Sequence, residues 1–219
     1  MPTVLITGAN RGIGLEFARQ FSADGWDVMT TARETSDELA RLGVRVELLD
    51  LRDLDDVAAL GAGIAAPLDL LIANAGTMTP ENGDTADDAR AWAEMLTVNC
   101  IAPYLLAKSV LRQVAAARGK LIALSSGMGS IGESSGGYVP YRTSKAALNM
   151  AWHSLAIEAR PHGVIAAAID PGWVKTRMGG PGAQISAEQS VGDMRRLIER
   201  LSLDQSGGFL KRDGSSHAW

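Results

Sequence analysis

Short apolar runs alternate along the chain with longer stretches in which apolar residues recur at helical spacing. Each short run is rich in Val, Ile, Leu or Ala, so it predicts a strand. Most of these runs lack polar alternation, which is typical of central strands covered on both faces. The predicted strands are residues 3–7, 27–32, 44–49, 68–73, 120–125, 164–170 and 208–210. The predicted helices include residues 14–24, 54–64, 87–117 (with a break early in the stretch) and 144–160.

Strands that alternate with helices of this length predict βαβ units around a parallel sheet. The handedness rule for such crossovers leads to a doubly wound, mostly parallel sheet of the Rossmann type. The chain has 219 residues, which suits one α/β domain over residues 1–219. No internal repeat or linker divides it, and loops are expected at residues 76–85, 127–139 and 179–182 and after residue 214. The sequence therefore predicts a single α/β domain.

A glycine-rich loop, TGANRGIG at residues 7–14, lies between the first predicted strand and the first predicted helix. Glycine is needed where the chain turns sharply, where backbone approaches a pyrophosphate, and where a helix packs closely on a strand. The free N–H groups at the start of the following helix would face the phosphates. The loop therefore predicts a dinucleotide site in the N-terminal half of the chain. Its candidate residues are Gly8, Asn10, Arg11, Gly12, Ile13 and Gly14.

The loop spacing is T-G-x-x-x-G-x-G, not the G-x-G-x-x-G of long-chain dehydrogenases. Asn74-Ala75-Gly76 follows the fourth predicted strand, Tyr141 and Lys145 form a Y-x-x-x-K pair, and Pro171-Gly172 follows the sixth strand. With these motifs the chain resembles the short-chain dehydrogenase/reductase family over nearly its whole length. Residues 141–149, 171–180 and 207–214 are similar to those of C-factor-like and sniffer-type carbonyl reductases within that family.

This resemblance implies which further residues contact a bound dinucleotide. The Asn-Ala-Gly motif would support the sheet beside the cofactor, Asp50 would contact the adenine, and Thr176 would meet the nicotinamide amide. A short substrate loop would follow Thr176, with Trp173 and Met178 either lining its pocket or belonging to the core or an interface. The implied cofactor-binding residues beyond the glycine loop are Asp50, Leu51, Asn74, Ala75, Gly76, Tyr141, Lys145, Pro171, Gly172, Val174 and Thr176.

Tyr141 and Lys145 lie four residues apart where the helix over residues 144–160 is expected to begin, so both side chains can point into one cleft. A free tyrosine has a pKa of about 10 and is a poor general base at neutral pH. The Lys145 ammonium and the positive nicotinamide ring of an oxidised cofactor would favour the phenolate. Lowering the pKa by about 3 units takes roughly 4 kcal/mol, which two nearby cations can supply. We expect Tyr141 to be the general acid or base.

The resemblance completes the catalytic set with a serine and an asparagine in the C-terminal part of the fold. Ser126 matches the catalytic serine, whose hydroxyl would hydrogen-bond the substrate oxygen. The 15-residue interval from Ser126 to Tyr141 is longer than is common in the family, so Ser125 remains an alternative. Asn99 matches the asparagine that holds a water in a proton relay behind the lysine. Its alternative role is that of a helix-interior residue bonded to backbone.

The end of the second predicted strand indicates which dinucleotide is bound. Members of the family that prefer NAD place an acidic side chain at the position of Ala32, where it accepts from the ribose 2′-hydroxyl. Alanine cannot do so, whereas Arg33 and Arg11 could hold a 2′-phosphate through charge-assisted hydrogen bonds. The sequence therefore predicts NADP(H) as the cofactor.

Charge and composition narrow the choice of partners. A net charge of −4, without a run of Lys or Arg, argues against a nucleic-acid surface. The start of the chain lacks the features of a signal peptide, and no apolar run of about 18 residues predicts a membrane span. The single cysteine, Cys100, cannot form an internal disulfide, which fits the cytoplasm. The three histidines have no ligand-like spacing, so no metal site is expected.

These features predict an oxidoreductase that transfers a hydride between NADP(H) and a small carbonyl or alcohol. Alternatives that use the same tyrosine are an alcohol dehydrogenase acting oxidatively, a dehydratase or an epimerase. An alternative of another class is a signalling or cofactor-sensing protein that binds dinucleotide with little turnover. The resemblance also implies a homodimer or homotetramer, formed through the helices over residues 87–117 and 144–160.

Overall fold

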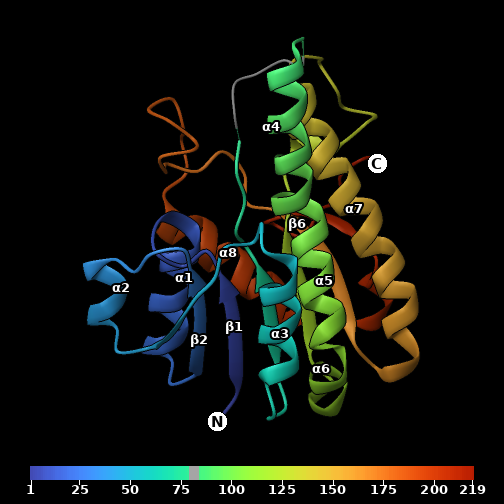
Figure 1. Cartoon of the computed structure of the whole chain (residues 1–219). Coiled ribbons are helices and arrows are strands. Elements are labelled where there is room, and N and C mark those ends of the chain that lie inside the picture. The colour runs from blue at the N-terminus through green and yellow to red at the C-terminus, as the bar shows by residue number, and fades with distance from the viewer. Residues whose placement is uncertain (79–83) are drawn as a thin grey trace.

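A seven-stranded parallel sheet with strand order β3-β2-β1-β4-β5-β6-β7 forms the centre of the computed structural model (Figure 1). The structure describes residues 1–78 and 84–219. The strands are β1 (Thr3–Thr7), β2 (Asp27–Ala32), β3 (Arg45–Leu48), β4 (Leu70–Ala73), β5 (Lys120–Leu124), β6 (Ile165–Asp170) and β7 (Phe209–Lys211). All seven predicted strands are present, with bounds within two residues of the prediction, and the doubly wound α/β fold is confirmed.

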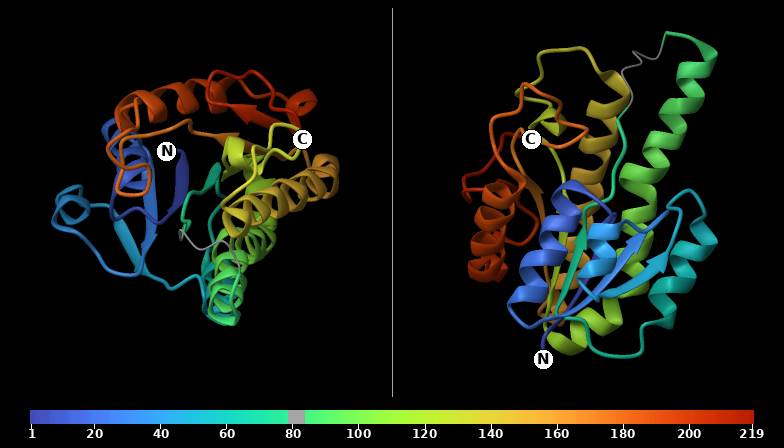
Figure 2. Two further views of the ribbon diagram at one scale, coloured as in Figure 1. Left: turned by 90° about the horizontal axis from the view of Figure 1, so that it is seen from above. Right: turned by 90° about the vertical axis from the view of Figure 1, so that its left-hand side faces the viewer.

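Helices cover both faces of the sheet, as the apolar strands predict. The helices are α1 (Gly12–Ala23), α2 (Asp37–Arg41), α3 (Leu54–Gly63), α4 (Ala86–Leu96), α5 (Ala102–Ser109), α6 (Leu111–Ala117), α7 (Val139–Ala159) and α8 (Ala187–Arg200). Figure 2 shows α1 and α8 on one face and α3 to α7 on the other. Alternate residues of β1 therefore serve different cores, because Val4 and Ile6 pack with α1 and α8 while Leu5 faces α3 and α5.

The helix predicted over residues 87–117 is divided into three α-helices. A five-residue π-helix, Thr97–Ile101, joins α4 to α5, and Val110 separates α5 from α6. A π-helical turn inserts an extra residue into the helical ladder, and such turns occur frequently at functional sites. Here the turn carries Asn99, whose side chain is buried.

Helix α7 begins at Val139, five residues earlier than predicted. Pro140 lies in its first turn, where the fixed φ of proline suits a helix and the missing N–H costs no hydrogen bond. Tyr141 therefore lies inside the helix together with Lys145. Helices α2 and α8 were not among the predicted helices. Apolar residues recur at helical spacing along α8, which buries Val191, Met194, Leu197 and Ile198 against the sheet and α1.

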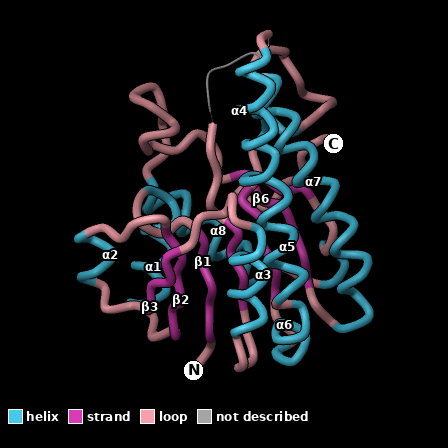
Figure 3. The backbone as a smooth tube through the Cα atoms, viewed as in Figure 1, coloured by secondary structure: helices cyan, strands magenta, loops and turns pink. Residues whose placement is uncertain are grey.

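The longer loops gather at the carboxyl edge of the sheet (Figure 3). The chain winds from β1 to β3, returns to β4 beside β1, and then winds outward to β7, so the winding reverses between β1 and β4. In open α/β sheets ligands bind at this reversal, outside the carboxyl ends of the strands. The expected loops at 127–139 and 179–182 lie at this edge, whereas residues 79–83 of the expected loop at 76–85 lie outside the described residues.

Candidate active site

The glycine loop is shaped by backbone that only glycine adopts without strain. Gly8 and Gly12 have φ of +69° and +58°, and the N–H groups of Gly8 and Ala9 both donate to the Thr31 carbonyl. A Cβ on Gly14 would overlap the Gly8 carbonyl oxygen and lie 2.5 Å from Asn74 Nδ2. The loop therefore packs tightly against the residues that follow β4.

The Asn74-Ala75-Gly76 motif, which follows β4, is hydrogen-bonded to the start of the glycine loop. Asn74 Nδ2 donates to the carbonyls of Thr7 (2.8 Å) and Gly8 (3.1 Å). The backbone N–H groups of Asn74 and Ala75 donate in turn to Thr7 Oγ1. These bonds fix the end of β1 against the end of β4, as the resemblance implies.

The residues around the loop fit a dinucleotide that carries an extra phosphate. Helix α1 has no acidic residue in its first turn, and its N-cap, Arg11, makes no side-chain capping bond, so the first N–H groups face outward. Arg11 and Arg33 are exposed, and neither takes part in an ion pair or side-chain hydrogen bond within the part of the chain that is described. Ala32 is buried at the end of β2. Two unpaired cations and the missing carboxylate match a 2′-phosphate.

The other implied adenine-side residues differ in what they can offer. A bidentate hydrogen bond from Arg52 holds the pKa of the Asp50 carboxyl below its usual range, with a smaller effect from Arg33. Asp50 is partly exposed and can reach a ligand, whereas the Leu51 side chain is buried. Leu51 can therefore meet a cofactor only through its backbone.

Gly14→Ala is expected to destabilise the fold, because the new methyl group overlaps backbone that cannot move away. The expected loss is about 1–3 kcal/mol in the free energy of unfolding, measured by urea denaturation. Gly63→Ala is the matched control, since no atom lies within 4 Å of a Cβ there. That control should leave stability unchanged or raise it by up to about 1 kcal/mol. Equal midpoints for parent and Gly14→Ala would contradict the close packing.

The proposed catalytic side chains meet at the carboxyl ends of β4 and β5. Lys145 Nζ donates to the Leu124 carbonyl (2.8 Å) and lies 5.8 Å from the centre of the Tyr141 ring. A Cβ on Gly76 would lie 3.6 Å from Lys145 Nζ and 3.2 Å from Asn99 Oδ1. The Ser126 hydroxyl lies close enough to the Tyr141 phenol to act on its pKa. The four residues therefore surround one small volume beside the glycine loop.

Burial dominates the titration of the tyrosine and the lysine. Burial raises the pKa of Tyr141 to about 12, while its hydrogen bond with Ser126 acts in the opposite direction. Burial likewise lowers the pKa of Lys145 to about 8. In the chain without a cofactor, burial therefore sets the direction of the Tyr141 pKa shift. The expectation that Lys145 and an oxidised nicotinamide ring together lower this pKa stays a prediction. At neutral pH the pair is a phenol beside an ammonium.

The two neighbouring serines have different surroundings. The Ser125 hydroxyl is buried and donates to Asn149 Oδ1 on α7. Ser126 is partly exposed, caps the short 3₁₀ turn Gly127–Gly129 by accepting from Met128 N (3.2 Å), and lies next to Tyr141. These contacts favour Ser126 over Ser125 as the hydroxyl that meets a substrate.

Asn99 is bonded to backbone and to α7. Its Oδ1 accepts from Thr77 N (2.8 Å), and its Nδ2 donates to Thr77 O (2.8 Å) and Ser144 Oγ (3.0 Å). The Asn99 side chain thus connects the π-helix by hydrogen bonds to the loop after β4 and to α7, the helix that carries Tyr141. Both hydrogens of the side-chain amide are therefore engaged by protein groups, while Oδ1 keeps one lone pair that could accept from a water.

The turn after β6 closes the cofactor side of the site. Gly172 has φ +78°, and a Cβ on Gly12 would lie 3.3 Å from Thr176 Cγ2, so this turn faces the glycine loop. The Val174 side chain is buried. Trp173 and Met178 are half exposed, and the Trp173 indole donates to the Gly179 carbonyl (2.7 Å). Both therefore belong to the loop surface and not to the core.

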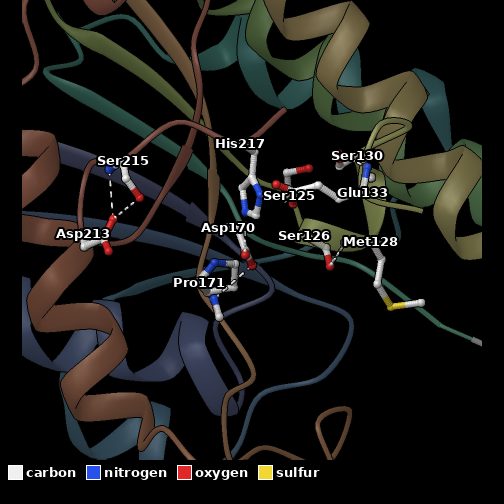
Figure 4. A network of polar contacts seen from close by, with 12 residues as sticks. Ser125, Ser126, Met128, Ser130, Glu133, Asp170, Pro171, Asp213, Ser215 and His217 are labelled. Atoms are coloured by element: carbon white, nitrogen blue, oxygen red, sulfur yellow. Dashed lines mark hydrogen bonds and ion pairs between the residues drawn. The ribbon is translucent and has the colours of Figure 1, made fainter. Parts of the chain in front are cut away.

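Three residues of this region were missed by the sequence reasoning. Asp170 ends β6 next to Pro171-Gly172, and its charge acts on both Tyr141 and Lys145. His217, from the C-terminal tail, bonds Asp170 (Figure 4). Arg142, in the first turns of α7, donates hydrogen bonds to the carbonyls of Gly136 and Gly137 and so fixes the preceding loop against this helix. The position of Asp170 before Pro-Gly is a usable signal, whereas nothing in the local sequence marks the other two.

Among the described residues, no group of three or more His, Cys, Asp or Glu side chains is arranged to hold a metal ion. In the same part of the chain, no helix combines the length and apolar character needed to span a membrane.

Comparison with known proteins establishes the family. The family model for short chain dehydrogenases matches residues 2–184. The C-signal protein of Myxococcus xanthus is 38% identical over 161 residues, which are 70% of this chain and 93% of that protein. The chain belongs to the short-chain dehydrogenase/reductase family.

Solved structures of two carbonyl reductases are similar over the whole chain. Carbonyl reductase Sniffer of D. melanogaster superposes with a TM-score of 0.91 at 33% identity, covering 100% of both chains. The NADPH-bound carbonyl reductase from chicken fatty liver superposes with a TM-score of 0.89 at 32% identity, covering 100% of this chain and 99% of that one.

Proposed function

We propose that this protein is an NADPH-dependent reductase of small carbonyl compounds, with Tyr141 as the general acid. The observation that carries the proposal is that Tyr141, Lys145 and Ser126 lie together beside the glycine loop. Arg11 in this loop and Arg33 after β2 form no ion pair with the described residues. The solved neighbours support it, since one is named as a carbonyl reductase and another is an NADPH-bound carbonyl reductase.

In this proposal NADPH supplies the hydride when it is bound. Ser126 donates its hydroxyl hydrogen to the substrate oxygen and so fixes the carbonyl next to Tyr141. The Tyr141 phenol gives its proton to that oxygen as negative charge develops there. Lys145 keeps an ammonium beside the phenol and offers hydrogens to the cofactor ribose. Asn99, on the π-helix, donates hydrogen bonds to Thr77 after β4 and to Ser144 on α7, and so fixes the positions of these segments relative to one another.

The protonation states favour reduction over oxidation. Reduction needs a tyrosine that carries its proton, and a pKa of about 12 keeps the phenol neutral at physiological pH. Oxidation needs a phenolate to accept a proton from the alcohol, and burial disfavours that form. We therefore place the enzyme in the reduction direction.

Reduction is expected to lose rate as the pH rises through about 8, where Lys145 loses its proton. A lysine with a lowered pKa is charged below that value and neutral above it, whereas Tyr141 stays protonated up to about 12. The measurement is kcat/KM for NADPH against pH, because this quantity reports groups of the free enzyme. We expect a plateau at low pH and a fall of about tenfold per pH unit above the break.

Lys145→Arg is the matched variant for this profile, since a guanidinium keeps its charge over the whole range. Its activity is expected to be lower, but without the break near the lysine pKa. A parent profile that stays level well above the pKa of Lys145 would contradict the assignment.

A second candidate function is cofactor sensing or signalling with little turnover, and the similarity to C-signal favours it. A binding protein has no need of a buried tyrosine beside a buried lysine, so the site supports the enzyme. NADPH consumption with a panel of aldehydes, ketones and quinones, beside NADPH binding measured by fluorescence, separates the two. Binding with turnover supports the reductase, and binding without turnover on any carbonyl supports the sensor.

Assembly as a homodimer or homotetramer and a cytoplasmic location stay predictions. Met150 and Ile157 leave apolar side chains exposed on α7, one of the two helices expected to form the interface.

A further inference from the structure

The C-terminal tail folds back over β7 and reaches the edge where the catalytic side chains lie. After a turn at Gly214 (φ +93°), Ser216 pairs antiparallel with Leu210. His217 N then donates to the Phe209 carbonyl (2.9 Å). The Trp219 carbonyl accepts from Gly132 N (2.8 Å), so the tail ends on the loop that follows Ser126.

The His217 ring lies between two carboxylates from separate parts of the chain. Its Nε2 lies 2.9 Å from Asp170 Oδ2, and its Nδ1 lies 3.0 Å from Glu133 Oε2. The ring stacks on Phe209 with centroids 4.5 Å apart, and only 6% of the side chain is exposed. Ionised carboxylates only accept hydrogen bonds, so both bonds form together when both ring nitrogens carry hydrogen. The bond from His217 holds the pKa of the Glu133 carboxyl below its usual range.

Each carboxylate lies in a segment that adjoins the candidate active site. Asp170 Oδ1 accepts from Gly172 N (2.9 Å), which fixes the turn on the cofactor side. Glu133 lies in the loop that begins at Ser126, and its N–H donates to Ser130 Oγ (3.0 Å). A Cβ on Gly127 would lie 3.1 Å from His217 Cε1, so the ring also contacts the residue next to Ser126. Figure 4 shows His217 directly above Asp170, beside the turn that carries Ser126 and Met128.

We propose that His217 is a positioning residue, whose ring joins Asp170 to Glu133 and so holds the turn of Ser126 at a fixed distance from the Pro171-Gly172 turn. The three side chains Asp170, His217 and Glu133 are called the tail bridge below. Its role in catalysis rests on the proposed reductase function, in which the first turn places the substrate oxygen and the second places the nicotinamide. Misplacement of reacting groups by about 1 Å can lower a rate by about 10²-fold, so a support of this kind affects turnover without touching the substrate.

His217→Phe tests the tail bridge, because phenylalanine keeps the stacking on Phe209 and removes both polar contacts. We expect kcat for carbonyl reduction to fall by about tenfold. The Kd for NADPH should stay within about twofold, since Arg11 and Arg33 lie outside the bridge. His162→Phe is the matched control, as it makes the same change at an exposed position, and its kcat should equal that of the parent. An unchanged kcat in His217→Phe would overturn the proposal.

Glu133→Ala tests the other end of the bridge at a carboxylate that is 45% exposed, where folding is not at risk. We expect it to lower kcat in the same direction as His217→Phe. If the two residues act through one bridge, the double variant loses no more kcat than the more damaged single variant. Losses that multiply in the double variant would overturn the bridge, as would a lowered melting temperature with unchanged kcat per NADPH-binding site.

Hydrogen exchange gives a readout that does not depend on turnover. In His217→Phe the peptides over residues 127–138 should exchange about tenfold faster, because the loop loses its tie to β6. Peptides from α8 should exchange as in the parent, and His162→Phe should match the parent throughout. Unchanged exchange over residues 127–138 would overturn the bridge even in a protein without reductase activity. Absence of turnover in the parent, by contrast, would contradict the proposed function and leave this structural result standing.

Discussion

Tyr141→Phe is expected to lower kcat for carbonyl reduction by about 10²-fold or more while NADPH binding survives. Tyr141 is 7% exposed and lies in the first turn of α7, so phenylalanine keeps the packing and removes only the hydroxyl. The lost group is the proposed proton donor, which lies beside the Ser126 hydroxyl. Steady-state NADPH consumption with a reactive ketone, together with the Kd for NADPH, measures both halves of this expectation.

Tyr104→Phe on α5 provides the control for this substitution. It removes the same hydroxyl from a partly buried tyrosine in a helix outside the catalytic group, and its kcat should equal that of the parent. Near-normal turnover in Tyr141→Phe would remove this tyrosine from the mechanism. A Tyr141→Phe protein that no longer bound NADPH would show that the residue acts in cofactor binding instead.

Ala32→Asp combined with Arg33→Ile is expected to change the cofactor preference from NADPH towards NADH. The new carboxylate repels a 2′-phosphate and accepts from a ribose 2′-hydroxyl, and the loss of Arg33 removes a phosphate donor. Charge-assisted bonds at an exposed edge contribute about 1.5–3 kcal/mol in total, which is roughly 10- to 100-fold in kcat/KM. The kcat/KM for NADPH should fall by that factor, and the value for NADH should rise.

Salt and a remote arginine provide the controls for the cofactor assignment. Raised ionic strength should weaken NADPH binding by the parent more than NADH binding, because only the former carries the extra phosphate. Arg112→Ile removes a charge from an exposed position on α6 and should leave the preference as it is. Equal use of NADH and NADPH by the parent, unchanged by the double substitution, would contradict the assignment of Ala32 and Arg33.

The sheet could be predicted from sequence because each strand is a short apolar run that needs cover on both faces. Helices α2 and α8 were not predicted. Helix α2 has five residues and one buried side chain, so it carries little pattern. Helix α8 was missed although its buried residues Val191, Met194, Leu197 and Ile198 recur at helical spacing. The predicted start of α7 is five residues too late, although Pro140 is a residue favoured in a first helical turn. The π-helix at Asn99 has no pattern that distinguishes it from an α-helix.

The site residues that lie in short motifs could be predicted, because each motif places its side chains through local geometry. What depends on tertiary contacts could not. The choice between Ser125 and Ser126 needed the contact with Asn149, which lies 24 residues away from Ser125. The pKa of Tyr141 needed its burial, which spacing does not reveal. The contact of His217 with Asp170 spans 47 residues and depends on the tail folding back.

Deuterium transfer tests the central claim most directly. The protein is mixed with NADPH that carries deuterium at the reactive carbon of the nicotinamide, in either stereochemical form, and with each carbonyl of the panel. Mass spectrometry then locates deuterium in the product. We predict an alcohol with one deuterium on its carbinol carbon, formed from only one of the two stereochemical forms of labelled NADPH. The rate of this transfer should fall by about 10²-fold or more in Tyr141→Phe. Tight NADPH binding with no labelled alcohol from any carbonyl would contradict it.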